Sequence, residues 1–262
     1  FKDFSRKKEI LASPWVGFKN FESLCSSYWF PIILKNTLTI SLLSLVIGFP
    51  IPIILALLLN EVRSNKFRSL VQTFSYAPHF ISMVVMCGMV AMFLSPTTGV
   101  VNKLLNALGL ESVFFMQEAG LFKWVYVLSG IWQGAGWSSV IYYAALSGVD
   151  KSLLEAADMD GATRLQKIWH VNLPVILPTI LVMLILQCGS LLSVGYEKAY
   201  LLQTSSNLTG SEIISTYVYK VGLVQSDFSF STAAGLFNTV VNCIILISAN
   251  QLSKKVAKTG LF

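Results

Sequence analysis

Five long apolar stretches alternate with shorter polar stretches along the chain. A helix rises about 1.5 Å per residue and the hydrocarbon core is roughly 30 Å thick, so about 20 apolar residues can cross it. The predicted membrane spans lie at about 32–59, 70–94, 121–146, 173–202 and 232–253. Pro50 and Pro52 should bend the first span, because proline has no backbone N–H to donate. The pattern predicts an all-α integral membrane protein.

The polar stretches predict the connecting elements. Residues 1–33 mix basic and aromatic side chains, as is typical of a membrane interface, and predict an interfacial elbow. Residues 60–68 and 204–231 predict polar loops. Between the second and third spans, Val100 to Leu108 predicts a short surface helix that stops at Gly109. Without an internal repeat or a separate soluble part, residues 1–262 are expected to form a single transmembrane domain.

Composition agrees with a bilayer environment. The 262 residues are 54% hydrophobic and 12% charged, whereas soluble domains carry about 25% charged residues. The net charge of +6 is scattered without a long basic face, which argues against nucleic-acid binding. The four cysteines are widely spaced and predict buried thiols and no metal site. They are Cys25, Cys87, Cys188 and Cys243.

Residues 147–174 lie between two spans but predict a water-facing helical hairpin. Asp150 can cap a helix that begins at Lys151. Gly161 allows a turn that a side chain would obstruct. A second helical run, about Thr163 to Val171, should end near Pro174, which lacks the donor to continue it. An apolar side of the first helix is expected from Leu153, Leu154, Ala157 and Met159.

This hairpin carries a resemblance to a known family. Glu155-Ala156-Ala157 is followed after three residues by Gly161 and, nine residues later, by Val171-Asn172-Leu173-Pro174. The pattern resembles the loop that marks the membrane subunits of bacterial ABC importers. Three further stretches are similar to permeases for complex sugars, so the resemblance covers nearly the whole chain. They are 78–82, 196–202 and 214–223.

The resemblance implies a permease of the carbohydrate-uptake (oligosaccharide and polysaccharide) type with the type I importer fold. That fold has six helices per subunit, so we expect one further span upstream of Phe1. The implied partners are a second permease, with which the chain is expected to form a heterodimer, two ATP-binding subunits and an extracytoplasmic solute-binding protein. The implied location is the bacterial cytoplasmic (inner) membrane. No Gly-x-x-x-x-Gly-Lys-[Ser/Thr] loop occurs here, so we expect no cofactor on this chain, and ATP and Mg on partner subunits.

The hairpin residues are candidates for coupling to the ATPase. A short projecting helix with apolar residues on one side can insert into a groove of a soluble partner. Glu155 is expected to pair with a basic group there; alternatively, it supports its own helix through Arg164 or Lys151. The coupling residues predicted by the resemblance are Glu155, Ala156, Ala157, Asp158, Gly161, Leu173 and Pro174.

Polar and aromatic residues within the spans are candidates for the transport pathway, because sugars bind through ring faces and hydrogen bonds. Each can instead serve helix packing or anchoring at the interface. On a helix, Tyr196 and Tyr200 share one face while Glu197 lies about 100° round. A site using all three must sit across that edge, or the helix must unwind after Gly195. The pathway candidates are Trp132, Gln133, Gln187, Tyr196, Glu197 and Tyr200.

The two histidines and the basic residues say less about function and membrane orientation. An ionisable group within a span is a functional candidate, but for His79 we favour a neutral imidazole bonded to a carbonyl left free near Pro78. His170 is expected to pack or to contact a partner. A cytoplasmic hairpin also places residues 60–68 and the C-terminus in the cytoplasm. Together with the hairpin, those regions hold nine of the 19 Lys and Arg residues, so charge alone does not settle orientation.

Three other functions remain open. A permease for another solute, such as an amino acid or an ion, shares the same loop pattern. An ion-coupled secondary transporter would need more spans, usually a repeat, and more buried charge than Glu197. An intramembrane enzyme would need paired catalytic residues, which the sequence lacks. The leading hypothesis is therefore a translocation subunit, not an enzyme, that forms the pathway for a sugar or oligosaccharide.

Overall fold

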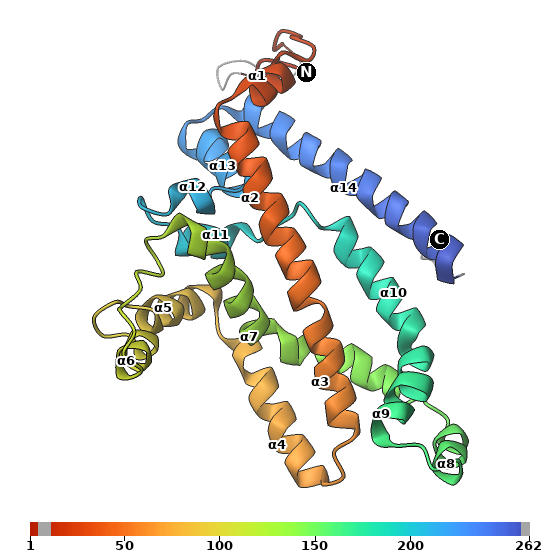
Figure 1. The fold of residues 1–262 in the computed structure, drawn as a ribbon. Coiled ribbons are helices and arrows are strands. Elements are labelled where there is room, and N and C mark those ends of the chain that lie inside the picture. The colour runs from red at the N-terminus through yellow and green to blue at the C-terminus, as the bar shows by residue number, and fades with distance from the viewer. Residues whose placement is uncertain (5–11, 258–262) are drawn as a thin grey trace. The chain divides into compact units, whose positions relative to one another are not determined.

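The computed structural model describes residues 1–4 and 12–257, and these residues are almost entirely helical (Figure 1). Outside the helices, Lys2 and Trp15 form one isolated antiparallel bridge. The elements are α1 (Lys19–Ser26), α2 (Trp29–Leu43), η1 (Ser44–Gly48), α3 (Pro50–Asn60), α4 (Asn65–Tyr76), η2 (Ala77–Phe80), α5 (Met83–Phe93), α6 (Val100–Ala107), α7 (Ala119–Leu146), α8 (Lys151–Met159), α9 (Arg164–Lys167), η3 (Ile168–Asn172), α10 (Leu173–Gly189), α11 (Tyr196–Leu202), α12 (Leu208–Ser211), α13 (Ile214–Tyr219), η4 (Lys220–Val224) and α14 (Phe228–Ala257).

Within the described residues, three helices are long and apolar enough to cross a membrane. They are Trp29–Asn60, Arg164–Gly189 and Phe228–Lys255. A bent pair, Asn65–Phe80 with Met83–Phe93, makes a fourth if it is counted as one broken span. Helix α7 covers the predicted third span with 28 residues but is not among these apolar helices. The all-α membrane fold is confirmed, whereas five continuous spans are not observed.

The first predicted span is continuous and departs from α-helical geometry just before its prolines. The segment η1 is a π-helical turn, in which Phe49 N–H donates to the Ser44 carbonyl at 3.1 Å. Pro50 and Pro52 have no N–H with which to bond the carbonyls four residues earlier. The wider turn lies where those carbonyls are left without their usual donors, which is a common place for a π-bulge.

The second predicted span, 70–94, is wrong as a continuous helix. Helix α4 begins earlier, at Asn65, with Ser64 accepting from the Phe67 N–H at 3.4 Å, so the predicted loop 60–68 is partly helical. The helical run then ends at Phe80, because Pro78 cannot donate and Ile81 is extended (φ −74°, ψ 128°).

The fourth predicted span, 173–202, is also broken. Helix α10 ends at Gly189 and α11 begins at Tyr196. The intervening backbone finds distant partners: Leu192 N–H donates to Asn242 Oδ1 at 2.9 Å, and Ser41 donates to the Leu191 carbonyl. The helix can therefore unwind without leaving these groups unpaired.

The predictions for the N-terminus and for the connecting segments are confirmed only in part. Residues 204–231 are not a plain loop, since α12, α13 and η4 lie within them. Part of the N-terminal elbow is helical as α1, and Phe1 stacks on Trp15 with ring centroids 5.5 Å apart. Helix α6 ends before Gly109, which has φ +77°, as predicted. The basic residues at 6–8 lie outside the described residues.

The chain divides into two compact units. The first unit comprises 1–42, 83–126 and 190–245, and the second comprises 43–82, 127–189 and 246–262. In the first unit, α2 is fastened to later segments by buried hydrogen bonds. Thr37 Oγ1 accepts from the Ile214 N–H at 3.1 Å, and α11 packs on α5.

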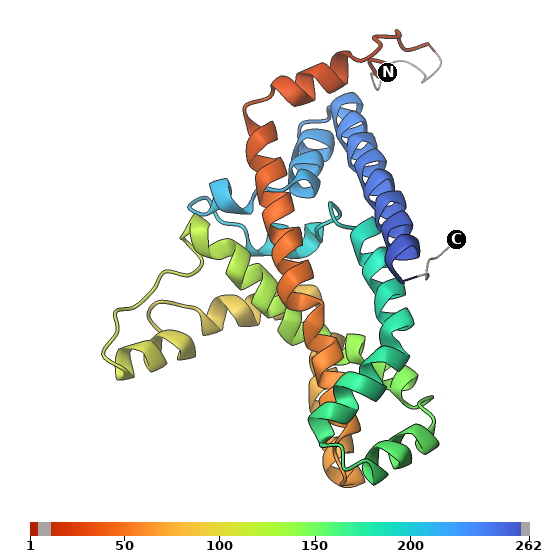
Figure 2. The ribbon, with the colours of Figure 1, turned by 45° about the vertical axis from the view of Figure 1, so that its right-hand side comes forward.

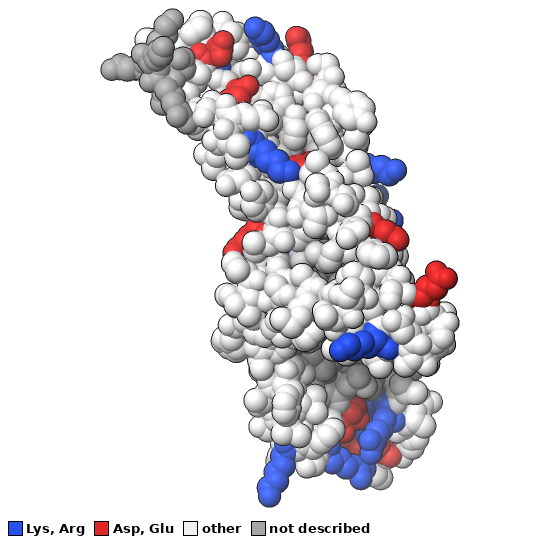
Figure 3. Space-filling view, turned by 90° about the vertical axis from the view of Figure 1, so that its left-hand side faces the viewer, with Lys and Arg blue, Asp and Glu red and all other residues white. Residues whose placement is uncertain are grey.

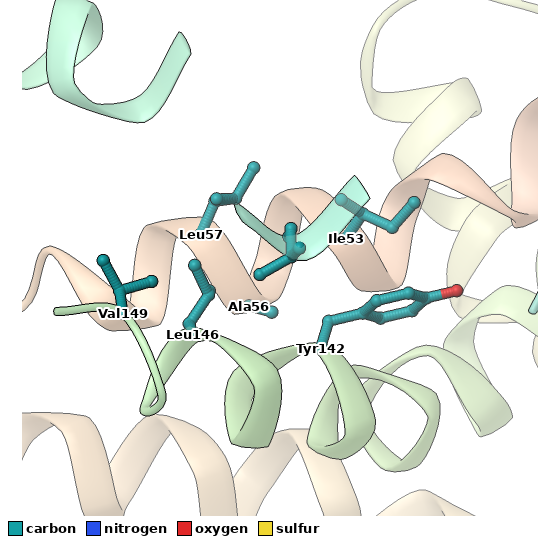
Figure 4. Packing of buried hydrophobic residues seen from close by; sticks show 7 residues of the cluster. Ile53, Ala56, Leu57, Tyr142, Leu146 and Val149 are labelled. Carbon is teal, nitrogen blue, oxygen red and sulfur yellow. The ribbon is translucent and has the colours of Figure 1, made fainter. Parts of the chain in front are cut away.

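The second unit contains a buried apolar cluster. In Figure 4, Tyr142 and Leu146 of α7 face Ile53, Ala56 and Leu57 of α3. Burying a large aliphatic side chain contributes about 1.5–3 kcal/mol, so this cluster holds α3 to α7. The complete cluster is Ile53, Ala56, Leu57, Tyr142, Leu146, Val149 and Ile176.

Most of the protein surface is uncharged. Figure 3 shows one face of the molecule, on which Lys, Arg, Asp and Glu are sparse. Large apolar side chains such as Phe74, Phe80 and Leu252 are more than half exposed. A surface of this kind suits lipid or further protein subunits, because bilayer hydrocarbon does not penalise exposed apolar groups.

Candidate coupling hairpin and transport pathway

The hairpin begins with the predicted cap. Asp150 has an extended backbone, and its Oδ1 accepts from the Ser152 N–H at 2.9 Å. Hydrogen bonds from the backbone and side chain of Ser152 hold the pKa of the Asp150 carboxyl below its usual value. The ionised carboxylate thus satisfies a free donor at the first turn of α8.

Gly161 ends α8 in the left-handed conformation, with φ +73°. A Cβ added to Gly161 would meet no atom within 4 Å. The Ala162 N–H reaches back to the Ala157 carbonyl at 2.9 Å, which closes the turn. Glycine is therefore favoured here by backbone conformation and not by lack of space, in agreement with the sequence.

The return arm of the hairpin differs from the prediction. Thr163 and Gln166 form a capping box that begins α9. The helix does not end near Pro174 but continues as one run from Arg164 to Gly189. The π-helical turn η3, Ile168–Asn172, comes just before Pro174, so the carbonyls that proline leaves without a donor fall in the wider turn.

Contacts between the arms hold the hairpin together. Figures 1 and 2 both show α8 beside the start of the α9–α10 run. Lys167 Nζ of the return arm lies 2.7 Å from Asp158 Oδ1 of α8. Within the return arm, His170 Nδ1 lies 3.0 Å from the Gln166 carbonyl oxygen. The Asp158 side chain is 62% exposed, so this ion pair contributes at most about 1 kcal/mol.

Glu155 projects from the hairpin without a partner in the described part of the chain. Its side chain is exposed, and neither Arg164 nor Lys151 pairs with it. The structure thus does not support the alternative in which Glu155 stabilises its own helix. The carboxylate is free to meet a basic group on another molecule.

The apolar residues predicted for one side of α8 do not all face the protein core. Leu154 is half-buried and packs on the buried cluster together with Ile168 and Val171. Leu153 and Met159 are instead exposed, at 49% and 89%. One leucine therefore anchors α8 to the core, and the other apolar side chains remain available for a partner.

The two arms also line an open pocket with a volume of about 450 Å³. Three predicted coupling residues, Ala156, Ala157 and Gly161, line it, whereas Leu173 and Pro174 do not. The full lining is Leu153, Ala156, Ala157, Asp160, Gly161, Ala162, Gln166, Lys167, His170 and Val171.

The pathway candidates of the second unit lie in different settings. Gln133 donates through Nε2 to the Ile81 carbonyl at 3.0 Å, so it supports the break between η2 and α5. Trp132 is 44% exposed, and Gln187 is exposed on α10. Gln133 is bonded to a backbone carbonyl, and Trp132 and Gln187 present surface that a ligand or subunit can reach.

His79 does not behave as predicted. Its ring stacks on Trp137 with centroids 4.8 Å apart and planes 3° apart. No hydrogen bond of the imidazole is found within the described residues. Ring stacking has therefore replaced the expected bond to a carbonyl near Pro78.

In the first unit, the structure brings two predicted pathway residues together and adds a third. The rings of Tyr196 and Tyr200 stack at 5.7 Å, as residues on one helix face should. The ring centroid of Tyr219 in α13 lies 4.7 Å from that of Tyr196 and 5.3 Å from that of Tyr200. Glu197 is exposed on α11. Sequence reasoning did not assign Tyr219, because nothing local links it to residues about 20 positions earlier.

Two further charged groups of the first unit, Lys198 and Glu212, are buried. Lys198 is 5% exposed, and its Nζ donates to the Tyr126 carbonyl at 2.6 Å and lies 4.4 Å from the Tyr126 ring centroid. Glu212 is 3% exposed and pairs with Lys220, which also donates to Gln203 Oε1 at 2.7 Å. Lys198 falls within the predicted span 173–202, where an ionisable group is a signal of function. Glu212 falls in the predicted polar loop 204–231 and carries no such signal.

Comparison with known proteins identifies the family. The family model described as binding-protein-dependent transport system inner membrane component matches residues 48–258. The chain belongs to this family. The permease is 45% identical over 262 residues to the polygalacturonan/rhamnogalacturonan transport system permease protein YteP of Bacillus subtilis (strain 168), covering 100% of this chain and 82% of that protein.

Two further likenesses agree. The permease is 36% identical over 244 residues to the arabinooligosaccharides transport system permease protein AraP of Halalkalibacterium halodurans, covering 91% of this chain and 74% of that protein. It also matches a chain in a crystal structure of a bacterial alginate ABC transporter in complex with an alginate pentasaccharide-bound periplasmic protein. That match has TM-score 0.91 and 46% identity, and it covers 94% of this chain and 85% of the other. The fold is therefore that of a type I ABC importer permease, a membrane subunit whose family relies on separate subunits for ATP hydrolysis.

Proposed function

We propose that the permease forms the translocation pathway for a sugar or oligosaccharide together with a second, non-identical permease subunit in the bacterial cytoplasmic membrane. Two ATP-binding subunits drive transport through the hairpin at 150–174, and an extracytoplasmic solute-binding protein delivers the substrate. The observation that carries the proposal is the hairpin itself. It has a left-handed Gly161, an unpaired exposed Glu155 and exposed apolar side chains, yet it is anchored to the core.

The anchoring supports a mechanical role for the hairpin. Leu154 of α8 packs on the same buried cluster that joins α3 to α7 and includes Ile176 of α10. A displacement of α8 by a bound partner would therefore press on several helices of the second unit at once, because packed interiors transmit strain. Glu155, Leu153 and Met159 would form the contact with the ATPase, with the carboxylate meeting a basic group.

ATP and Mg belong to the partner subunits in this proposal. The sequence has no Gly-x-x-x-x-Gly-Lys-[Ser/Thr] loop to cradle phosphates. Among the described residues, no group of three or more His, Cys, Asp or Glu side chains is placed to hold a metal. The residues of this chain would bind, orient and release the solute and would transmit movement.

The solute class is inferred from the relatives and from the tyrosine cluster. The relatives YteP and AraP and the alginate transporter are all named for oligosaccharides or polysaccharides. Tyr196, Tyr200 and Tyr219 offer ring faces and hydroxyls of the kind that sugar recognition uses. We assign these rings and Glu197 to the pathway, with Trp132 and Gln187 as further candidates; Gln133 is tied to the Ile81 carbonyl.

Transport by the reconstituted importer tests the function. The permease, its partner subunits and its solute-binding protein are placed in vesicles, and uptake of labelled oligosaccharides is measured with and without ATP. We expect uptake that requires both ATP and the binding protein and that survives the collapse of ion gradients by ionophores. ATP-driven uptake of an amino acid or ion instead would support the alternative permease, and loss of uptake with the ion gradient would support a secondary transporter.

Glu197→Gln tests the site assignment, because it keeps the side-chain size and removes the charge. We expect a loss of uptake with intact assembly. Glu111→Gln, at another exposed acidic residue of the first unit, is the matched control and should transport normally. If Glu197→Gln disrupts pairing with the second permease, the carboxylate forms an interface ion pair. If transport and assembly are both normal, the assignment of Glu197 is wrong.

A further inference from the structure

A second cavity, of about 240 Å³, lies within the first unit. Three segments that are distant in sequence form it: α2, the first residues of α7, and α12. Neither the hairpin nor the tyrosine cluster contributes to it. Its lining is Lys35, Asn36, Thr39, Ile40, Ala119, Gly120, Lys123, Thr209 and Gly210.

Specific contacts hold the walls of this cavity in place. The Asn36 side-chain amide donates to the carbonyls of Thr209 and Glu212, both at 2.9 Å, which ties α2 to α12. The backbone of Gly210 lies so close to α7 that an added Cβ would be 2.1 Å from the Ala119 carbonyl oxygen. The cavity is therefore preformed, which lowers the cost of binding a ligand.

The cavity carries positive charge without a compensating acid in its lining. Lys35 and Lys123 come from different helices, and neither has an ion-pair partner in the part of the chain that the structure describes. Glu118 precedes α7 but does not line the cavity. Glu212 follows α12, but its carboxylate is buried and engaged by Lys220 and by Thr216 Oγ1 at 2.9 Å. The two ammonium groups are thus available to an anion.

We propose that this cavity binds the carboxylate of an acidic sugar unit, so that the permease selects anionic oligosaccharides, such as uronate chains, over neutral ones. The proposal rests on the proposed function. Two lysines supply charge-assisted hydrogen bonds to the carboxylate. Thr39 and Thr209 supply hydroxyls for those of the sugar. The volume lies below the roughly 300–1,000 Å³ of sites for drug-sized ligands, so the cavity suits one sugar unit and not a whole chain.

A pair of probes that differ only in charge tests the proposal. The permease in complex with its partner subunits, without the solute-binding protein, is placed in nanodiscs of phosphatidylcholine. Equilibrium dialysis then measures the binding of trigalacturonate and of its carboxyl-reduced, neutral counterpart. Hydrogen bonds to a charged group are roughly twice as strong as those between neutral groups, so we expect wild type to bind the acidic trimer about tenfold or more tightly than the neutral one.

Substitutions assign the discrimination to the cavity. We expect Lys35→Gln and Lys123→Gln each to reduce the preference for the acidic trimer, and the double variant to abolish it with little change in binding of the neutral trimer. Lys123→Arg should keep most of the preference, since it keeps the charge. Lys103→Gln is the matched control, because Lys103 is exposed on α6 in the same unit and does not line the cavity.

Three results would overturn the proposal: equal affinity for both trimers, an unchanged preference in the double variant, or no binding of the acidic trimer. If the double variant instead weakens only the association of the solute-binding protein, the cavity receives an acidic protein surface and the proposal is wrong. Uptake by wild type separates the two hypotheses. ATP-driven oligosaccharide uptake without charge selection contradicts this inference alone, whereas absence of any oligosaccharide uptake contradicts the proposed function.

Discussion

The hairpin at 147–174 and the tyrosine cluster are built in opposite ways. The hairpin occupies consecutive residues, and the hydrogen bonds that shape its turn and caps join residues at most five positions apart, such as Ala162 to Ala157. The tyrosine cluster joins α11 to α13, with Tyr219 brought against Tyr196 across 23 positions of sequence. A local site of the first kind should fail when one backbone position is strained. A site of the second kind should lose function gradually as single contacts are removed.

The largest effect is expected for Gly161→Val. A non-glycine residue in the left-handed region costs roughly 1–2 kcal/mol, and a β-branched one is among the least tolerated there. The turn should rearrange and misplace α8, so we expect normal membrane abundance, weakened association of the ATPase and abolished uptake. Copurification of the ATPase and vesicle uptake measure these outcomes.

Gly161→Asn is the control for that substitution, because asparagine tolerates positive φ and should retain most activity. An added Cβ meets nothing within 4 Å, so a steric explanation is not available. Normal uptake by Gly161→Val would mean that the hairpin tolerates a changed turn, and the local character of this site would be contradicted.

The next largest effect is expected when the two neighbouring leucines of α8 are replaced separately. Leu154→Ala removes a half-buried anchor on the cluster, which should cost about 1–2 kcal/mol from lost burial and lower the apparent Tm by a few degrees. Leu153→Ala, at an exposed position, should leave the Tm unchanged but weaken binding of the ATPase. Thermal unfolding in detergent and ATPase copurification measure the pair. If the two substitutions changed the Tm and the binding of the ATPase equally, anchoring and docking would not be divided between Leu153 and Leu154.

Removing one ring of the tyrosine cluster should have a moderate effect. An aromatic pair is worth about 0.5–1.5 kcal/mol beyond its area, so Tyr219→Leu should weaken oligosaccharide uptake about two- to tenfold at subsaturating substrate. Tyr219→Phe keeps the ring and should have a smaller effect. Tyr28→Leu, at an exposed aromatic residue of the same unit outside the cluster, is the control. Normal uptake by the Tyr219→Leu variant would show that this ring is not part of the pathway.

The smallest effect concerns Asp150 and depends on pH. Because the folded Asp150 carboxyl has a lowered pKa, its cap is fully formed above the ordinary Asp pKa of about 3.9. The contribution is lost as the pH falls through the lower pKa of the folded state. Asp150→Asn should therefore leave uptake at pH 7 nearly unchanged, since asparagine also caps helices.

Amide exchange checks the pH dependence of this cap. After correction for intrinsic exchange rates, protection of the first turn of α8 should fall at acid pH in wild type but not in Asp150→Asn. The same fall in both variants would attribute the acid sensitivity to another group.

The sequence by itself determined the elements that depend on neighbouring residues. Asp150 caps α8, Gly161 takes the left-handed conformation and α6 stops before Gly109, because each of these depends on backbone groups only a few positions away. The apolar content and the hairpin pattern were also sufficient to place the chain among the ABC importer permeases, as the family match confirms.

Only the tertiary structure decided where helices break and which side chains meet. A helix in an apolar segment continues unless its backbone groups find other partners, and these partners come from far along the chain. Asn242 accepts from Leu192 N–H at the end of α10, and Gln133 donates to the Ile81 carbonyl at the end of η2. The same reason explains the missed residues: Tyr219 joins Tyr196, and Lys35 shares a cavity with Lys123, through packing that no local pattern records.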